Sequence, residues 1–112
     1  MPPQHRHRGD HMDIAVEDVP AQHRFEARVD GALAGFAEYM TTDTLIVFTH
    51  TEVDPSFEGK GVGGVLVRSA LDLVRAGEHK VLPLCPFVKA WIGKHPDYFD
   101  LVYDAPPSKV TD

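Results

Sequence analysis

Alternating apolar and polar positions dominate the first half of the chain. Residues 24–30 alternate in this way, as in a strand with one buried face. Asp30-Gly31 then predicts a hairpin turn, and residues 33–40 predict a second strand. Residues 45–53, LIVFTHTEV, predict a third strand that is central in the sheet, because its first four residues are all apolar. Three strands joined by short turns indicate an antiparallel meander.

The pattern then changes to that of a helix. Between Val62 and Val74, apolar residues recur at the i, i+3, i+4, i+7 spacing, with charged residues on the opposite face. This spacing predicts a helix over residues 61–76, ended by Gly77. Residues 80–84 predict a fourth strand, in which the proline at position 83 indicates a sheet edge or a local break in pairing. Because a helix connects them, the third and fourth strands should run parallel.

The last ordered segments are marked by prolines. Pro86 suits the first position of a second helix, Pro96 ends that helix, and residues 98–103 predict a last strand. Trp91, within the second helix, is expected to be a core residue.

The two ends of the chain are polar. Residues 1–12, MPPQHRHRGDHM, predict a disordered leader, whose histidines could alternatively chelate a metal weakly. Residues 105–112 predict a flexible tail. The expected domain therefore spans residues 13–104. Its fold class is α/β (α+β): a single domain with a mixed, mainly antiparallel sheet and two main helices.

Composition narrows the function classes. The chain has 112 residues and a net charge of −6, so it fits one domain and is a poor candidate for nonspecific nucleic-acid binding. The acidic charge could still attract a basic substrate. The single cysteine excludes an internal disulfide, and no apolar window is long enough for a membrane span or a secretory signal. We therefore expect a cytoplasmic protein with neither nucleic acid nor membrane as partner.

The stretch FEGKGVGGVLV, residues 57–67, concentrates glycines between the third strand and the helix. It fails as a P-loop because Lys60 is followed by glycine instead of Ser or Thr. Gly59, Gly61 and Gly64 spell the dinucleotide fingerprint G-x-G-x-x-G, but they lie mid-chain and no acidic residue ends the following strand.

Two physical interpretations of the glycines stay open. A helix N-terminus offers unpaired N–H groups and a partial positive charge, and glycines there let a phosphate approach the backbone. Alternatively, Gly63 and Gly64 only allow close packing of the helix on the sheet.

Residues 58–63, EGKGVG, are similar to the [QR]-x-x-G-x-[GA] loop of the GCN5-related N-acetyltransferases (GNAT superfamily), in the same place between strand and helix. Residues 82–98, LPLCPFVKAWIGKHPDY, resemble the short YjdJ-type acetyltransferase subgroup. The resemblance covers roughly residues 24–103. Glu58 departs from it, because a carboxylate at the usual Gln or Arg position would repel a pyrophosphate and leave Lys60 as the nearest cation.

The resemblance implies a minimal GNAT-like fold in which the third and fourth strands splay apart. It implies acetyl-CoA as co-substrate, no metal, and direct transfer of the acetyl group to a primary amine on a small molecule or a protein lysine. The alternative is a non-catalytic acyl-CoA-binding module. A monomer or weak homodimer is expected. The implied CoA-binding residues are Thr51, Glu52, Val53, Glu58, Gly59, Lys60, Gly61, Val62, Gly63, Gly64, Cys85, Pro86 and Phe87.

Four residues are candidates for catalysis. His50 and Glu52 lie on one face of the third strand, so either could take the proton of the amine, and Glu52 could also attract it. Structural or solvated roles are their alternatives. Cys85, just before Pro86, would feel the dipole of the second helix, and could relay the acetyl group, act as an acid–base group or remain inert. The resemblance also implies Tyr98 as a proton donor to the leaving thiolate, with simple packing as the alternative.

Overall fold

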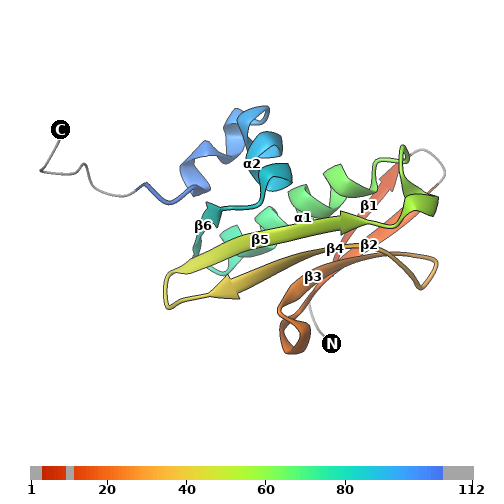
Figure 1. Ribbon diagram of the computed structural model, residues 1–112, viewed down its shortest axis with the longest axis horizontal. Helices are drawn as coiled ribbons and strands as arrows, with labels where there is room; N and C mark the ends of the chain where they lie inside the picture. The colour runs from red at the N-terminus through yellow and green to blue at the C-terminus, as the bar shows by residue number, and fades with distance from the viewer. Residues whose placement is uncertain (1–3, 10–11, 105–112) are drawn as a thin grey trace, which may run out of the picture.

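The computed structural model describes residues 4–9 and 12–104 as a single six-stranded sheet in the order β1-β2-β3-β4-β5-β6, with two main helices (Figure 1). The strands are β1 (Gln4–Gly9), β2 (Met12–Val19), β3 (Arg24–Val29), β4 (Ala32–Thr41), β5 (Leu45–Val53) and β6 (Lys80–Pro83). The helices are α1 (Val62–Ala76) and α2 (Pro86–Gly93), with 3-10 turns at η1 (Pro20–Gln22), η2 (Pro55–Phe57) and η3 (Pro96–Leu101).

The predicted meander is confirmed in β3, β4 and β5, which pair antiparallel in chain order. Asp30 and Gly31 both have positive φ, 50° and 84°, as the tight turn between β3 and β4 requires. Residues 46–48 of β5 are buried in succession, so the start of this strand is covered on both faces as predicted.

The pairing of β5 with β6 is parallel, as predicted, and short. It joins Leu45–Phe48 to Lys80–Pro83, and the amides of Leu84 and Cys85 both donate to the Phe48 carbonyl. The chain then leaves the sheet, because Pro83 has no N–H for the ladder and Pro86 starts α2. Within the described residues, the last five positions of β5 have only β4 as a ladder partner. This divergence is the splay that the resemblance implied.

The helices and the sheet share one core. Gly61 is the N-cap of α1 and Gly77 its C-cap, so the predicted helix is confirmed. Side chains of α1, α2 and β2–β6 form a single buried cluster. Along β4, buried positions alternate with half-exposed ones, so the opposite face of the sheet remains in contact with solvent. Among the described residues, no helix combines the length and apolar character needed to cross a bilayer.

One expectation about the N-terminal region is wrong, and one strand there was not predicted. Gln4–Gly9, expected within the disordered leader, forms β1, and the pairing of β1 with β2 is antiparallel. This strand is formed by backbone hydrogen bonds to the free edge of β2. Its sequence has no alternation of apolar residues from which it could be predicted. Residues 12–19 do alternate, with Ile14 and Val16 buried, and the sequence prediction overlooked this strand.

The predicted last strand over residues 98–103 is also wrong. Residues 96–101 form the 3-10 turn η3, because Pro96 fixes the backbone at its first position. Only Val102 forms a bridge, to Val81, and the Tyr103 amide donates to the Val81 carbonyl. The expected tail, residues 105–112, lies outside the described residues.

Candidate functional site

A β-bulge in β5 decides which way its later side chains point. β4 pairs Tyr39 with Phe48 but Glu38 with His50, so Thr49 is an extra residue. A bulge shifts the alternation of faces by one position. Every residue of β5 beyond Thr49 therefore lies on the face opposite to that expected from regular alternation with Phe48.

Thr51 and Val53 lie on the face covered by the helices. The buried Cys85 thiol donates to the Thr51 hydroxyl, with 3.4 Å between sulfur and oxygen. Cys85 is the N-cap of α2, as predicted. The Val53 side chain and the Phe87 ring both approach Gly63 at the start of α1.

His50 and Glu52 lie on the open face, and the structure confirms that they are neighbours. Nε2 of His50 is 2.7 Å from Oε2 of Glu52, and the side chains are 52% and 60% exposed. The Phe36 ring lies 6.3 Å from the imidazole, and the Arg24 guanidinium lies 4.5 Å above the Phe36 ring. A ligand can therefore reach this pair from solvent.

The strand β5 separates two groups of candidates that the sequence had placed in one site. Cys85 and Thr51 are on one face, and His50 and Glu52 are on the other. The two faces meet at the edge of β5 that β6 leaves unpaired beyond Phe48.

The glycine loop before α1 is open at two positions. Gly59 and Gly61 have φ of 79° and 83°, and a Cβ at either would meet no atom within 4 Å. The first helical hydrogen bond runs from the Val65 amide to the Gly61 carbonyl, so the earlier amides have no partner within the helix. Glu58 and Lys60 are exposed beside them.

The two following glycines differ from each other. A Cβ at Gly63 would lie 2.8 Å from Cζ of Phe87, so a larger residue here requires the half-exposed Phe87 ring to move. A Cβ at Gly64 would lie 3.7 Å from Nε1 of Trp91, an ordinary contact. The sequence allowed close packing of the helix on the sheet for both residues, and the contact with the sheet is an ordinary one, 3.5 Å from a Cβ at Gly63 to the Val53 side chain.

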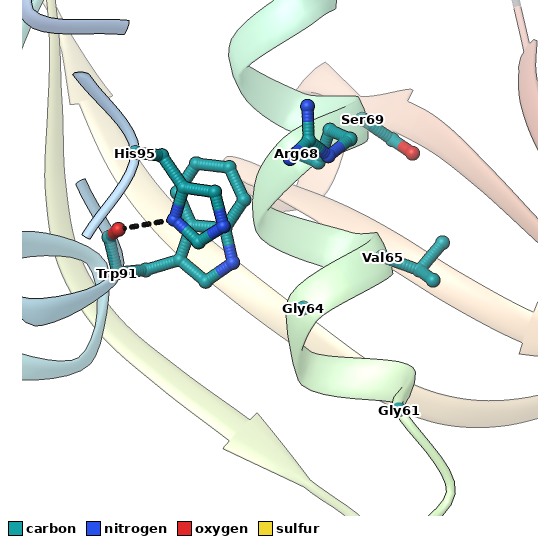
Figure 2. Close-up of a pocket in the computed structure, with 7 residues that line it drawn as sticks. All are labelled: Gly61, Gly64, Val65, Arg68, Ser69, Trp91 and His95. Carbon is teal, nitrogen blue, oxygen red and sulfur yellow. Dashed lines mark hydrogen bonds between the residues drawn. The ribbon is translucent and has the colours of Figure 1, made fainter. Parts of the chain in front are cut away.

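A cavity of about 290 Å³ lies between α1 and α2, next to the loop (Figure 2). The rings of Trp91 and His95 stack in it, with centroids 3.6 Å apart and planes within 10°. The Arg68 guanidinium lies 5.1 Å from the centre of the Trp91 ring. Sequence reasoning did not assign these three residues to a site. The i, i+4 spacing of Trp91 and His95 was the available signal.

Tyr98, in η3, contacts a later part of α1. Its hydroxyl donates to Asp72 at 2.6 Å and accepts from Arg68 at 3.2 Å. Burial and the bond to the Asp72 carboxylate raise the pKa of Tyr98 above its usual range. Asp72 is eleven residues past Gly61, about 16 Å along the helix axis. This hydroxyl therefore fastens η3 to α1, at a distance from the glycine loop.

Comparison with known proteins shows the family of this chain. The model of the GCN5-related N-acetyl-transferase family matches residues 24–101, most of the chain. A crystal structure of ribosomal-protein-alanine N-acetyltransferase from Brucella melitensis biovar Abortus 2308 is similar, at 23% identity and a TM-score of 0.47 over 80% of this chain and 67% of that one. No curated protein matches the chain. Because the family model spans residues 24–101, the chain belongs to the family of GCN5-related N-acetyltransferases.

Proposed function

We propose that this protein transfers the acetyl group of acetyl-CoA to a primary amine, on a small molecule or a protein lysine, by direct attack. The observation that carries this proposal is the free edge of β5 beyond Phe48, which begins where β6 leaves the sheet and ends at the glycine loop. Membership of the acetyltransferase family supports it. The acyl donor supplies an activated thioester carbonyl, and the chain supplies the groups described below.

The loop is suited to hold a pyrophosphate. Gly59 and Gly61 have the left-handed backbone that glycine tolerates, a Cβ at either would meet no atom within 4 Å, and the amides of the first turn of α1 follow. Those amides and the helix dipole favour an anion. The amide of Glu58 bonds to the Pro55 carbonyl, and its exposed side chain can stay in solvent while Lys60 supplies a positive charge.

The free edge of β5 is suited to hold an extended chain that carries amide groups. Backbone N–H and C=O groups of residues 51–53 would pair with the pantetheine arm as a strand partner would. Cys85, Pro86 and Phe87 at the start of α2 form the other wall. Cys85 is buried and bonded to Thr51, so we assign it to lining this groove and assign no covalent relay to it.

The pair of His50 and Glu52 is suited to take a proton from the amine. In the tautomer that donates Nε2–H to the carboxylate, Nδ1 of His50 carries the lone pair that accepts a proton. The exposed carboxylate of Glu52 would also attract a cationic amine from solvent. The amine would approach from the open face, and the acyl donor from the face of the helices.

Two measurements test the proposal. Acetyl-CoA and CoA, but not NAD or ATP, are expected to raise the Tm of the protein. No stabilisation by either form of CoA would overturn it. Turnover on lysine peptides and polyamines is then expected to fall about 100-fold or more in Glu52→Gln or His50→Ala, since general bases contribute at least that much.

The alternative function, a non-catalytic acyl-CoA-binding module, predicts binding without turnover. A protein that binds acetyl-CoA but acetylates no amine acceptor would support it. Cys85→Ala separates the roles of the thiol, because a lining role leaves most of the turnover and a covalent relay does not.

A further inference from the structure

An apolar row, made of Met40, Val47 and Leu82, crosses three strands of the sheet. Met40 of β4 pairs with Val47 of β5, and Val47 pairs with Leu82 of β6. Residues that are directly paired in a ladder lie on the same face of a sheet. None of the three belongs to the buried core cluster, whereas the residues on either side of Val47 do. The apolar row therefore lies on the open face, opposite to the helices.

The apolar row presents a large side chain to solvent. Val47, between two apolar neighbours, is only 6% exposed, while Met40 at the end of the row is 58% exposed. Leu82 is half-buried. Single exposed apolar side chains are common on protein surfaces, but neighbouring ones on a face that is otherwise polar are typical of an interaction site.

The bulge at Thr49 places the reactive pair on the same face as the apolar row. Regular alternation from Val47 would send His50 and Glu52 to the side of the helices. The extra residue shifts the alternation, so both follow Val47 on the open face. Along the strand, Val47 lies roughly 10 Å from His50 and roughly 16 Å from Glu52, at about 3.3 Å per residue. An extended chain spans these distances in about three to five residues.

The charge around the reactive pair suits a cationic acceptor. Glu38 is the ladder partner of His50, and the Glu52 carboxylate is mostly exposed. A cavity of about 140 Å³ lies next to Glu52. Arg24, which follows in the same cross-strand row as Glu38, is ion-paired with Glu26, so its charge is balanced. This end of the open face therefore attracts a cation, and the other end offers an apolar surface.

We propose that the acceptor is a lysine within an extended segment of a protein, and that an apolar side chain about three to five positions from this lysine docks on the apolar row. The inference rests on the proposed function, because it requires the acceptor amine at His50 and Glu52. A small amine would contact the reactive pair alone. A second copy of the chain on the apolar row would obstruct the approach to the pair, and the neighbouring carboxylates disfavour an anionic lipid surface.

Steady-state acetylation by the full chain, with acetyl-CoA as donor, tests the docking. Each peptide in the series contains one lysine and one leucine, placed three, four or five positions before or after the lysine, and its control has serine in place of the leucine. The best leucine peptide is expected to have a kcat/KM about tenfold above that of its serine control, the effect of burying one apolar side chain. Nα-acetyl-lysine amide should match the serine peptides.

Substitution of Met40 tests whether the apolar row causes this preference. Met40→Ser is expected to remove most of the preference for leucine, because it removes the exposed apolar surface. Met40→Leu, the matched variant that keeps an apolar side chain, should retain the preference. Turnover of Nα-acetyl-lysine amide should be unchanged in both variants, which also shows that they are folded.

The possible failures differ from one another. Equal kcat/KM for leucine and serine peptides, with turnover of small amines retained, overturns the inference and leaves the proposed function standing. A preference for leucine that survives Met40→Ser also overturns the docking on the apolar row. No turnover of any amine overturns the proposed function and the inference with it.

Two binding measurements address the other occupants of the apolar row. Sedimentation velocity reports a second copy, and flotation with phosphatidylcholine vesicles reports a lipid surface. The wild type is expected to sediment as a monomer and to stay unbound to vesicles. A dimer or a vesicle-bound fraction that Met40→Ser abolishes would assign the apolar row to that occupant and overturn the inference.

Discussion

The helix α1 begins in an open region and ends in a closed one. At its start, Gly61 has no neighbour within 4 Å of a Cβ position, and the cavity adjoins the first two turns. At its end, Arg75 donates to both carboxylate oxygens of Asp100, and one turn earlier Asp72 accepts the Tyr98 hydroxyl proton.

At the start of α1 the polar backbone groups are available to a ligand, whereas at its end the polar side chains stabilise the fold. The first amides of any helix have no partner within it, and here the loop before them contributes no side chain to cap them. The polar side chains near the end of α1 are instead satisfied by η3, the segment that follows α2. The same helix is thus available to a ligand at one end and committed to the fold at the other.

Gly63 lies at the open end of α1 and contacts the Phe87 ring of α2. Its substitution should have the largest effect on stability. Gly63→Val forces the Phe87 ring away from α1 and is expected to lower the free energy of unfolding by about 1–3 kcal/mol. Gly64→Ala is the matched control and should be neutral or stabilising, because its Cβ makes an ordinary contact. Urea unfolding measures both. If Phe87→Ala did not restore stability to Gly63→Val, the contact would not be the cause.

Substitution of Tyr98 tests how much the polar contacts at the closed end of α1 stabilise the fold. Tyr98→Phe removes a hydroxyl that bonds to Asp72 and Arg68, and is expected to cost about 1–2 kcal/mol of unfolding free energy. Thermal unfolding should show a drop in Tm of several degrees. The proton-donor role that the resemblance implied predicts instead a large fall in turnover with little change in Tm.

Substitution of Gly61 tests whether the loop and the first turn of α1 bind a ligand. Gly61→Ala adds no clash but strains a residue with φ of 83°, so a loss of about 1 kcal/mol in stability is expected. The affinity for CoA should fall as well, because the new methyl group shields the amides of the first turn. Full affinity for CoA in this variant would contradict the assignment of the loop to the pyrophosphate.

The ion pair of Arg75 and Asp100 is exposed and should have the smallest effect. The hydrogen bond from Arg75 holds the pKa of the Asp100 carboxyl below its usual range. A carboxyl with a depressed folded-state pKa stabilises the protein above its ordinary pKa, and this contribution is lost as pH falls through the folded-state value. The small difference in Tm between wild type and Asp100→Asn should therefore be present at neutral pH and disappear in strong acid. A difference that persists there would indicate another role for Asp100.

Local patterns in the sequence predicted most elements correctly. The alternation in β3, the apolar start of β5 and the helical spacing of α1 each concern residues close in sequence, and burial on one face is visible in such spacing. The same holds for Pro86 at the start of α2 and for the neighbours His50 and Glu52. The sequence did not predict β1, because a strand held by backbone hydrogen bonds and without an apolar face has no such pattern.

The sequence by itself determined the family loop, its place before the long helix and the residue types available for acid–base chemistry. Only the tertiary structure decided which of them meet. The bulge at Thr49 puts Thr51 beside Cys85 and leaves His50 and Glu52 on the other face of β5. The packing of α2 against α1 brings Arg68 to Trp91 and His95, 23 and 27 positions away in the chain. These contacts depend on register and on helix–helix packing, which join residues distant in sequence and so have no signature in local spacing.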